Sequence, residues 1–137
     1  MNAYVTYNTE YKLLICRQHK CGIARDHIQR HFRRYHQTVP LAMRDAIVDY
    51  SKTIDLAPPQ NIAVVGEMVH AIEGLTVTDG YQCTYYDCSE VRGTEGSMKE
   101  HCKKDHGWLT VTGIMWKQQA VQTIFEGSRR KYISIKL

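Results

Sequence analysis

The chain begins with short apolar segments separated by polar turns. A segment follows in which apolar residues recur with the period of a helix. Residues 4–7 and 13–15 are apolar and β-branched, which predicts two extended segments. Asp26 and Gln29 have the spacing of a capping box, so a helix is expected to begin near Asp26. On a helical wheel, one face of this helix carries Ile28, His31, Phe32 and Tyr35.

The middle of the chain predicts a second helix that begins at Pro40, a residue favoured in the first helical turn. Its apolar positions recur at spacings of four, three and four residues, at Met43, Ile47, Tyr50 and Ile54. The segment 62–77 is less regular. Val64-Val65 and residues 75–77 are compatible with strands, and residues 68–72 with a helical turn.

A third helix is predicted near the middle of the second half. Asp79-Gly80 is a turn dipeptide, and Ser97 with Glu100 has the form of a capping box. These signals predict a helix over about residues 98–106.

The C-terminal part has the pattern of strands. Residues 109–111 and 120–125 read as extended, and residues 132–137 alternate partly between apolar and polar. Gly127-Ser128 between the last two segments predicts a β-hairpin.

Two clusters of cysteine and histidine carry the candidate chemistry. Each has two cysteines five positions apart and then two histidines five positions apart, with nine or twelve residues in between. Thiolates from a tight knuckle and imidazoles from a following helix are typical of tetrahedral zinc. The sequence therefore predicts two structural Zn²⁺ sites. Their ligands would be Cys16, Cys21, His31 and His36 in the first and Cys83, Cys88, His101 and His106 in the second.

The histidine spacing constrains the helix that carries each pair. Five residues correspond to about 140° around an ideal helix, so both imidazoles reach one metal only if the last turn loosens or breaks. Other donors compete for a place. His19 and His27 lie near the first cluster, and Cys102 stands four residues before His106, the spacing of one helix face.

Composition narrows the class of protein. The chain has 137 residues, a formal net charge of +4 and five cysteines. No apolar run is long enough to cross a membrane, no secretory signal is evident, and the histidines that complete each cysteine pair favour metal in a reducing compartment over disulfides. Four protein ligands at each site leave no open position for catalysis, so we expect neither an enzyme nor a small-molecule substrate.

Basic residues around the first cluster predict contact with nucleic acid, DNA rather than RNA. The candidate residues are Arg17, Lys20, Arg25, Gln29, Arg30, Arg33 and Arg34. Arginine can contact phosphate or guanine, and glutamine can contact adenine. The alternative is a protein-interaction or dimerisation module, in which the apolar stripe of residues 41–54 and the last strand would face a partner.

The order of motifs resembles a fungal double C2H2 module, the family of orsellinic acid biosynthesis cluster protein D. The motifs are Leu14-Ile15-Cys16, Ile28-x-x-His31, Gly80-Tyr81-Gln82-Cys83, His106-Gly107-Trp108, Trp116 and Gln122-Thr123-Ile124-Phe125, followed by Lys131-Tyr132-Ile133. The resemblance implies zinc, a longer fungal parent protein and a possible link to mobile elements. We also expect a nuclear, intracellular location, and we expect the chain to be a fragment of a longer protein.

Together these patterns predict a small α+β zinc-binding domain over residues 1–137. Two fused C2H2-like ββα fingers would occupy about residues 11–37 and 79–108. A helical connector would span residues 38–78, and residues 109–137 would contribute C-terminal strands with a β-hairpin. The expected partners are nucleic acid and the rest of a longer chain, but no membrane.

Overall fold

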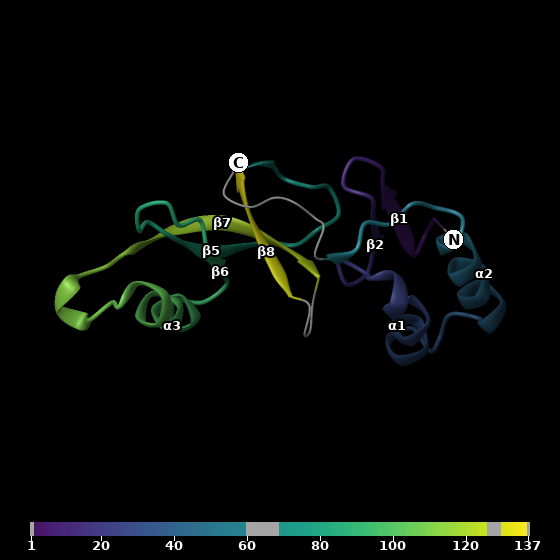
Figure 1. The fold of residues 1–137 in the computed structure, drawn as a ribbon. Helices are drawn as coiled ribbons and strands as arrows, with labels where there is room; N and C mark the ends of the chain where they lie inside the picture. The colour runs from purple at the N-terminus through teal and green to yellow at the C-terminus, as the bar shows by residue number, and fades with distance from the viewer. Residues whose placement is uncertain (1, 60–68, 126–129, 137) are drawn as a thin grey trace. The chain divides into compact units, whose positions relative to one another are not determined.

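The structure is a computed structural model that describes residues 2–59, 69–125 and 130–136. These residues form a small α+β fold with three α-helices and paired strands (Figure 1). The chain divides into two compact units. Unit one comprises Met1–Ala63 with Phe125–Arg129, and unit two comprises Val64–Ile124 with Arg130–Leu137.

Unit one begins with the two extended segments that the sequence predicts. Strands β1 (Val5–Asn8) and β2 (Leu13–Cys16) pair antiparallel, and the short strand β3 (Cys21–Gly22) returns beside β2. Phe125 also belongs to this unit and pairs in parallel with Gly22. The register places Cys16 opposite Cys21.

Helix α1 (Ile28–Tyr35) follows a short 3₁₀ turn at Arg25–His27. The predicted capping box is wrong, because His27 is the N-cap residue and no side chain caps the helix. The 3₁₀ turn contains Asp26, near which the sequence predicted the helix to begin. Tyr35, predicted for the core face, is the last residue of α1 and is 55% exposed.

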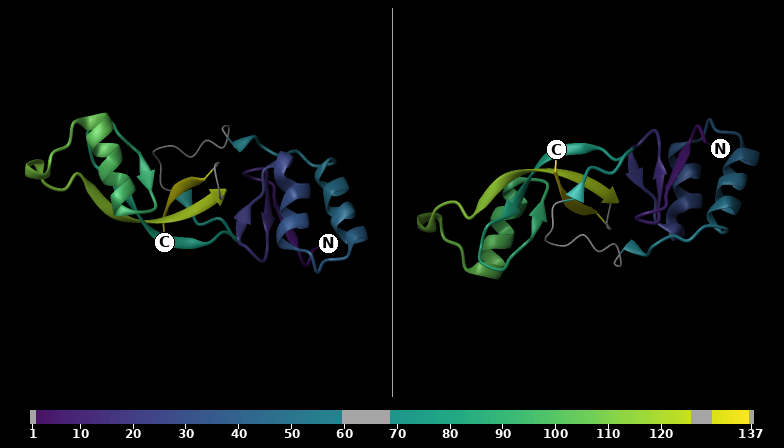
Figure 2. Two further views of the ribbon diagram at one scale, coloured as in Figure 1. Left: turned by 90° about the horizontal axis from the view of Figure 1, so that it is seen from below. Right: turned by 90° about the horizontal axis from the view of Figure 1, so that it is seen from above.

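Helix α2 (Leu41–Ser51) begins after Pro40, as predicted. It lies beside α1 within unit one (Figure 2). Its apolar stripe packs on the core of its own unit, with Ile47 fully buried. The buried members of this core are Val5, Leu14, Cys16, Ile23, Ile28, Phe32 and Ile47, and Met43, Tyr50 and Ile54 pack against them.

Unit two is built around strand β5 (Val77–Cys83), which pairs antiparallel with β6 (Val91–Arg92) and with β7 (Trp116–Phe125). Strand β8 (Lys131–Lys136) pairs with β7 and, in parallel, with β4 (Val69–His70). The predicted C-terminal strands are therefore present. The predicted turn at Gly127-Ser128, the strand at Val64-Val65 and Leu137 lie outside the described residues.

Three local predictions in unit two are wrong. Asp79-Gly80 lies inside β5, where a side chain on Gly80 would meet Val121, so the glycine serves close packing of strands and not a turn. Residues 69–70 form β4 because they pair with β8, so the predicted helical turn is absent there. Residues 110–112 form a 3₁₀ turn in place of a strand, closed by the amide of Thr112 donating to the Leu109 carbonyl.

Helix α3 (Glu95–His106) begins earlier than predicted. Its N-cap is Thr94, whose hydroxyl oxygen accepts a hydrogen bond from the Ser97 amide, so Ser97 is capped and does not cap. Gly107 ends the helix in the left-handed conformation, with φ of 62°. The helix packs against β5 and β6, and the buried core there comprises Cys83, Met98, Cys102, Trp108 and Trp116.

Candidate metal centres

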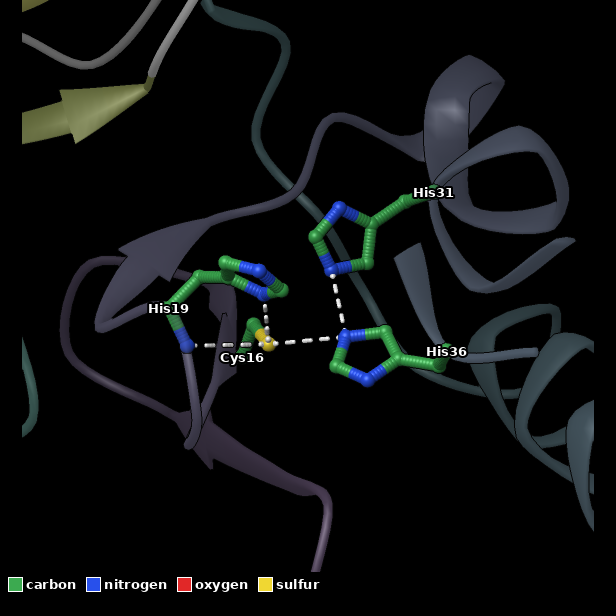
Figure 3. A group of neighbouring side chains, drawn as sticks. All are labelled: Cys16, His19, His31 and His36. Carbon is green, nitrogen blue, oxygen red and sulfur yellow. Dashed lines mark hydrogen bonds between the residues drawn. The ribbon is translucent and has the colours of Figure 1, made fainter. Parts of the chain in front are cut away.

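The first cluster gathers one cysteine and three histidines, which we call site one: Cys16, His19, His31 and His36 (Figure 3). One donor atom from each lies within 4.8 Å of the others. Cys16 Sγ is 3.3 Å from His19 Nδ1 and 3.4 Å from His36 Nε2, and His36 Nε2 is 3.1 Å from His31 Nε2. Strand β2, the knuckle and helix α1 each contribute to this group.

Cys21 does not belong to the group that site one comprises. It is buried in β3. Residues directly opposite each other on antiparallel strands point to the same face of the sheet, and Cys21 is opposite Cys16. Cys21 thus shares the sheet face of Cys16, although its sulfur is not in the group, and its predicted ligand role stays a prediction. His19, which the sequence offered as a competing donor, joins the cluster.

The second cluster, site two, brings together all four of the predicted residues: Cys83, Cys88, His101 and His106. Their donor atoms also lie within 4.8 Å of one another, and Cys88 Sγ is 3.3 Å from His101 Nε2. Cys83 ends β5, Cys88 follows in the knuckle, and α3 carries both histidines. Met98, one turn before His101, is fully buried in the same core cluster as Cys83.

In both helices the second histidine stands at the C-terminal end, which lets two histidines five residues apart reach one site. His36 is the C-cap of α1 and has φ of −128° and ψ of 48°, so it has left the helix, as the spacing requires. His106 is the last residue of α3, and the left-handed Gly107 follows it. The rings of His101 and His106 stand edge to face with centroids 4.9 Å apart.

Other donors lie close to the sites without joining them. Cys102 is fully buried in the core of unit two and is not a member of site two. His27 is likewise outside site one and lies 3.9 Å from the carboxylate of Asp26. Asp105 Oδ2 lies 3.0 Å from His101 Nδ1, outside hydrogen-bond geometry.

Burial sets the protonation of these donors. Burial lowers the pKa of His31 to about 4, and the neighbouring His36 and His19 rings act in the same direction. The His31 ring is therefore neutral at neutral pH, which is the form that binds a metal. Burial raises the pKa of the Cys83 and Cys88 thiols, so a metal entering site two must displace protons from them.

The residues at both sites fit zinc. Thiolate and imidazole are the donors that structural zinc uses, and four of them converge at each site. At site two the buried Nε2 of His106 has no hydrogen-bond partner among the described residues. A buried nitrogen without a partner is costly, and a metal ion would satisfy it. Both sites can thus hold a metal ion, and zinc is compatible with them.

The predicted nucleic-acid residues lie on α1, at two positions that contact backbone carbonyls, and in the first knuckle. Gln29, Arg30, Arg33 and Arg34 are exposed on α1. Two other arginines make contacts that support the fold of unit one.

Arg25 donates from its two terminal nitrogens to the carbonyls of Ser51 and Ile54, and Arg17 donates to the carbonyl of Asn2. Lys20, in the first knuckle, is exposed and adopts a positive φ of 54°. Within the described part of the chain, none of the helices is both long and apolar enough to cross a membrane.

Comparisons with known proteins place the chain in a family. Residues 3–107 match the family of orsellinic acid/F9775 biosynthesis cluster protein D. The protein of that name from Emericella nidulans is 26% identical over 129 residues, which cover 94% of this chain and 25% of the relative. The chain thus spans about a quarter of the length of the curated relative it matches. No solved structure matches the chain. Because the family match covers most of its length, this chain belongs to the family of orsellinic acid/F9775 biosynthesis cluster protein D.

Proposed function

We propose that this chain is a zinc-stabilised module that binds nucleic acid, DNA in preference to RNA, through the exposed face of α1. In this proposal, each unit is a finger in which strands and a knuckle supply one end of the metal site and a helix supplies two histidines. Site two has the two cysteines and two histidines of a C2H2 finger, and site one has His19 of the knuckle beside Cys16. The metals stabilise the fold and do not catalyse a reaction, because four protein donors surround each position.

One observation carries the nucleic-acid part of the proposal. Arg30, Arg33 and Arg34 are all exposed, whereas Ile28 and Phe32 on the same helix are buried in the core of unit one. The core and site one thus anchor one side of α1, and the opposite side presents three guanidinium groups. Such groups bind phosphate with charge-assisted hydrogen bonds and can also contact guanine.

The helix α3 of unit two offers a weaker surface for phosphate. Lys99, Lys103 and Lys104 are exposed there, but Lys99 lies 3.7 Å from the Glu95 carboxylate, and Glu100 is exposed on the same helix. Lys103 lies over the Trp108 ring, 5.9 Å from its centroid. Mixed charge reduces the field that attracts a polyanion, so α1 is the better candidate.

A triple substitution of Arg30, Arg33 and Arg34 by alanine tests the proposal. The three side chains lie outside the core and site one, so the variant should keep its fold and its zinc. We expect weaker binding to duplex DNA and a slope of log affinity against log salt that is smaller by about three. The measurement is a filter-binding titration at several salt concentrations, with RNA of the same sequence run in parallel.

A matched control removes the same charge elsewhere. Lys99, Lys104 and Lys117 are exposed on α3 and β7, and their replacement by alanine also lowers the net charge by three. This control should bind DNA nearly as well as the wild type. Equal losses in the two triple variants would reject α1 as the interface, and no binding by the wild type at low salt would reject nucleic-acid binding altogether.

A second candidate function is protein interaction, for which unit two offers a specific surface. Leu109, Val111 and Ile114 are exposed at 64%, 91% and 75% around the 3₁₀ turn that follows α3. The surfaces that the sequence suggested for a partner do not support this role, because the α2 stripe packs in its own core and Ile133 and Ile135 of β8 are buried. Sedimentation of the wild type and of Val111→Ser tests this candidate. Self-association of the wild type that is lost in Val111→Ser would favour it.

The wider context of the proposal follows from the family and the size of the chain. The relative is about four times longer than the matched segment, so we propose that this module works within a longer fungal parent protein. A DNA partner would place that protein in the nucleus. Imaging of the tagged parent protein tests the location, and cytoplasmic protein alone would contradict it.

A further inference from the structure

Site one contains a donor that the corresponding position of site two lacks. His19 and Tyr86 each stand three residues after the first cysteine of their knuckle. The following residues, Lys20 and Asp87, share a left-handed backbone with φ of 54° and 60°. The two knuckles therefore resemble each other in backbone, yet Tyr86 is 91% exposed whereas His19 is half-buried against the other donors.

His19 makes two separate contacts with the Cys16 sulfur. Its ring Nδ1 lies 3.3 Å from Cys16 Sγ, and its backbone amide donates to the same sulfur at 3.4 Å (Figure 3). The His19 ring also stands edge to face against the rings of His31 and His36, with centroids 5.2 Å and 4.9 Å apart. The imidazole is thus aimed into the cluster by its position in the knuckle.

The separations between the donors fit one tetrahedral metal. Metal bonds of about 2.0–2.1 Å to nitrogen and about 2.3 Å to sulfur give tetrahedral edges of roughly 3.3–3.6 Å. Two separations from Cys16 Sγ are 3.3 Å and 3.4 Å, and the His31–His36 separation of 3.1 Å is slightly shorter than such an edge. All donor atoms lie within 4.8 Å of one another. A metal ion therefore needs only small adjustments of side chains that already converge.

We infer that His19 is the fourth ligand of the metal at site one, together with Cys16, His31 and His36. Cys21 is then a structural thiol, buried in β3, and not a ligand. This inference rests on the metal-binding part of the proposed function. With one thiolate and three neutral imidazoles, site one carries a net charge of +1 when it holds a divalent metal, whereas site two with two thiolates is neutral.

Cobalt(II) substitution of the full chain tests the assignment, because thiolate-to-cobalt charge transfer reports how many thiolates bind metal. The wild type should show two cobalt ions bound by three thiolates, from Cys16, Cys83 and Cys88. Cys21→Ser should keep both ions and the full charge-transfer band. His19→Ala should weaken the binding of one of the two cobalt ions by more than about 100-fold, since loss of even an outer-shell partner lowers metal affinity by 10–100-fold. Tyr86→Ala is the matched control and should change neither ion.

A measurement on the unaltered chain avoids any loss of folding in the variants. In protein loaded with cadmium-113, the β-protons of a ligating cysteine couple to the metal. Coupling to Cys16, Cys83 and Cys88 but not to Cys21, with coupling to a His19 ring nitrogen, would support the inference. Coupling to Cys21, or a four-thiolate cobalt spectrum, would overturn it while leaving metal binding intact. A chain that binds no metal would overturn the proposed function as well.

Discussion

A buried glutamine in unit two provides a test of the packing of this unit that does not depend on metal binding. Gln122 of β7 is 1% exposed. Its Oε1 accepts a hydrogen bond from the Ile72 amide at 2.8 Å, and its Nε2 donates to the carbonyls of Ile72 and Leu75 at 2.9 Å and 3.1 Å. One side chain thus satisfies three backbone groups of the segment that precedes β5.

Replacing Gln122 by methionine keeps the length of the side chain and removes all three hydrogen bonds. Each bond contributes about 0.5–1.5 kcal/mol net, and a buried amide or carbonyl left without a partner costs about 1–3 kcal/mol. The Ile72 carbonyl keeps one partner, because it also accepts a hydrogen bond from the Leu75 amide at 3.3 Å. We therefore expect the free energy of unfolding to fall by roughly 2–4 kcal/mol.

The assay is urea unfolding of the zinc-loaded chain, followed by circular dichroism and by the fluorescence of its two tryptophans. Gln118→Met is the matched control, because Gln118 lies on the same strand but is exposed. The control should stay within about 0.5 kcal/mol of the wild type. A Gln122→Met variant that is no less stable than this control would refute the idea that the glutamine holds the segment in place.

Three further substitutions test the packing of unit two. A Cβ atom on Gly80 would lie 2.7 Å from Val121 Cγ2 and 3.0 Å from the Arg92 carbonyl oxygen, so Gly80→Ala should lower the free energy of unfolding by about 1–3 kcal/mol. Gly96 of α3 has open space around its Cα, so Gly96→Ala should leave thermal stability unchanged or raise it by up to about 1 kcal/mol, and a loss there would contradict the packing. Met98→Ala should cost about 2–5 kcal/mol in chemical unfolding, and a cost below 1 kcal/mol would show that the side chain is not a core residue.

The sequence predicts best where the chemistry of single residues is distinctive. Cysteine and histidine at repeated spacings identify both clusters, and all four donors predicted for site two converge. The helical wheel separates Ile28 and Phe32 from the arginines of α1, because helix geometry fixes which side chains share a face. The loosened helix end at His36 also follows from its spacing alone.

The sequence predicts less well where distant segments decide the local structure. Gly80 reads as a turn, but it lies within β5 because β7 approaches it closely, and that approach depends on strand pairing. Residues 69–70 become a strand only because β8 lies beside them. The cap of α3 falls on Thr94, since several polar residues in that segment could cap a helix and packing selects among them.

The same limit applies to the functional residues. Arg25 belongs to a basic cluster in the sequence, but its contacts with the carbonyls of Ser51 and Ile54 become visible only when the end of α2 lies beside it. His19 and Cys21 are both plausible ligands by type. The knuckle brings the His19 ring to Cys16, His31 and His36, and residue spacing does not encode how the knuckle turns.

Native mass spectrometry of the zinc-loaded chain can establish whether each chain holds two metal ions at its two Cys/His sites. One spectrum counts the zinc ions and the subunits together. We expect two zinc ions per chain, with one lost when Cys83 is replaced by serine. A wild-type spectrum with one zinc ion per chain, or with none, would contradict it.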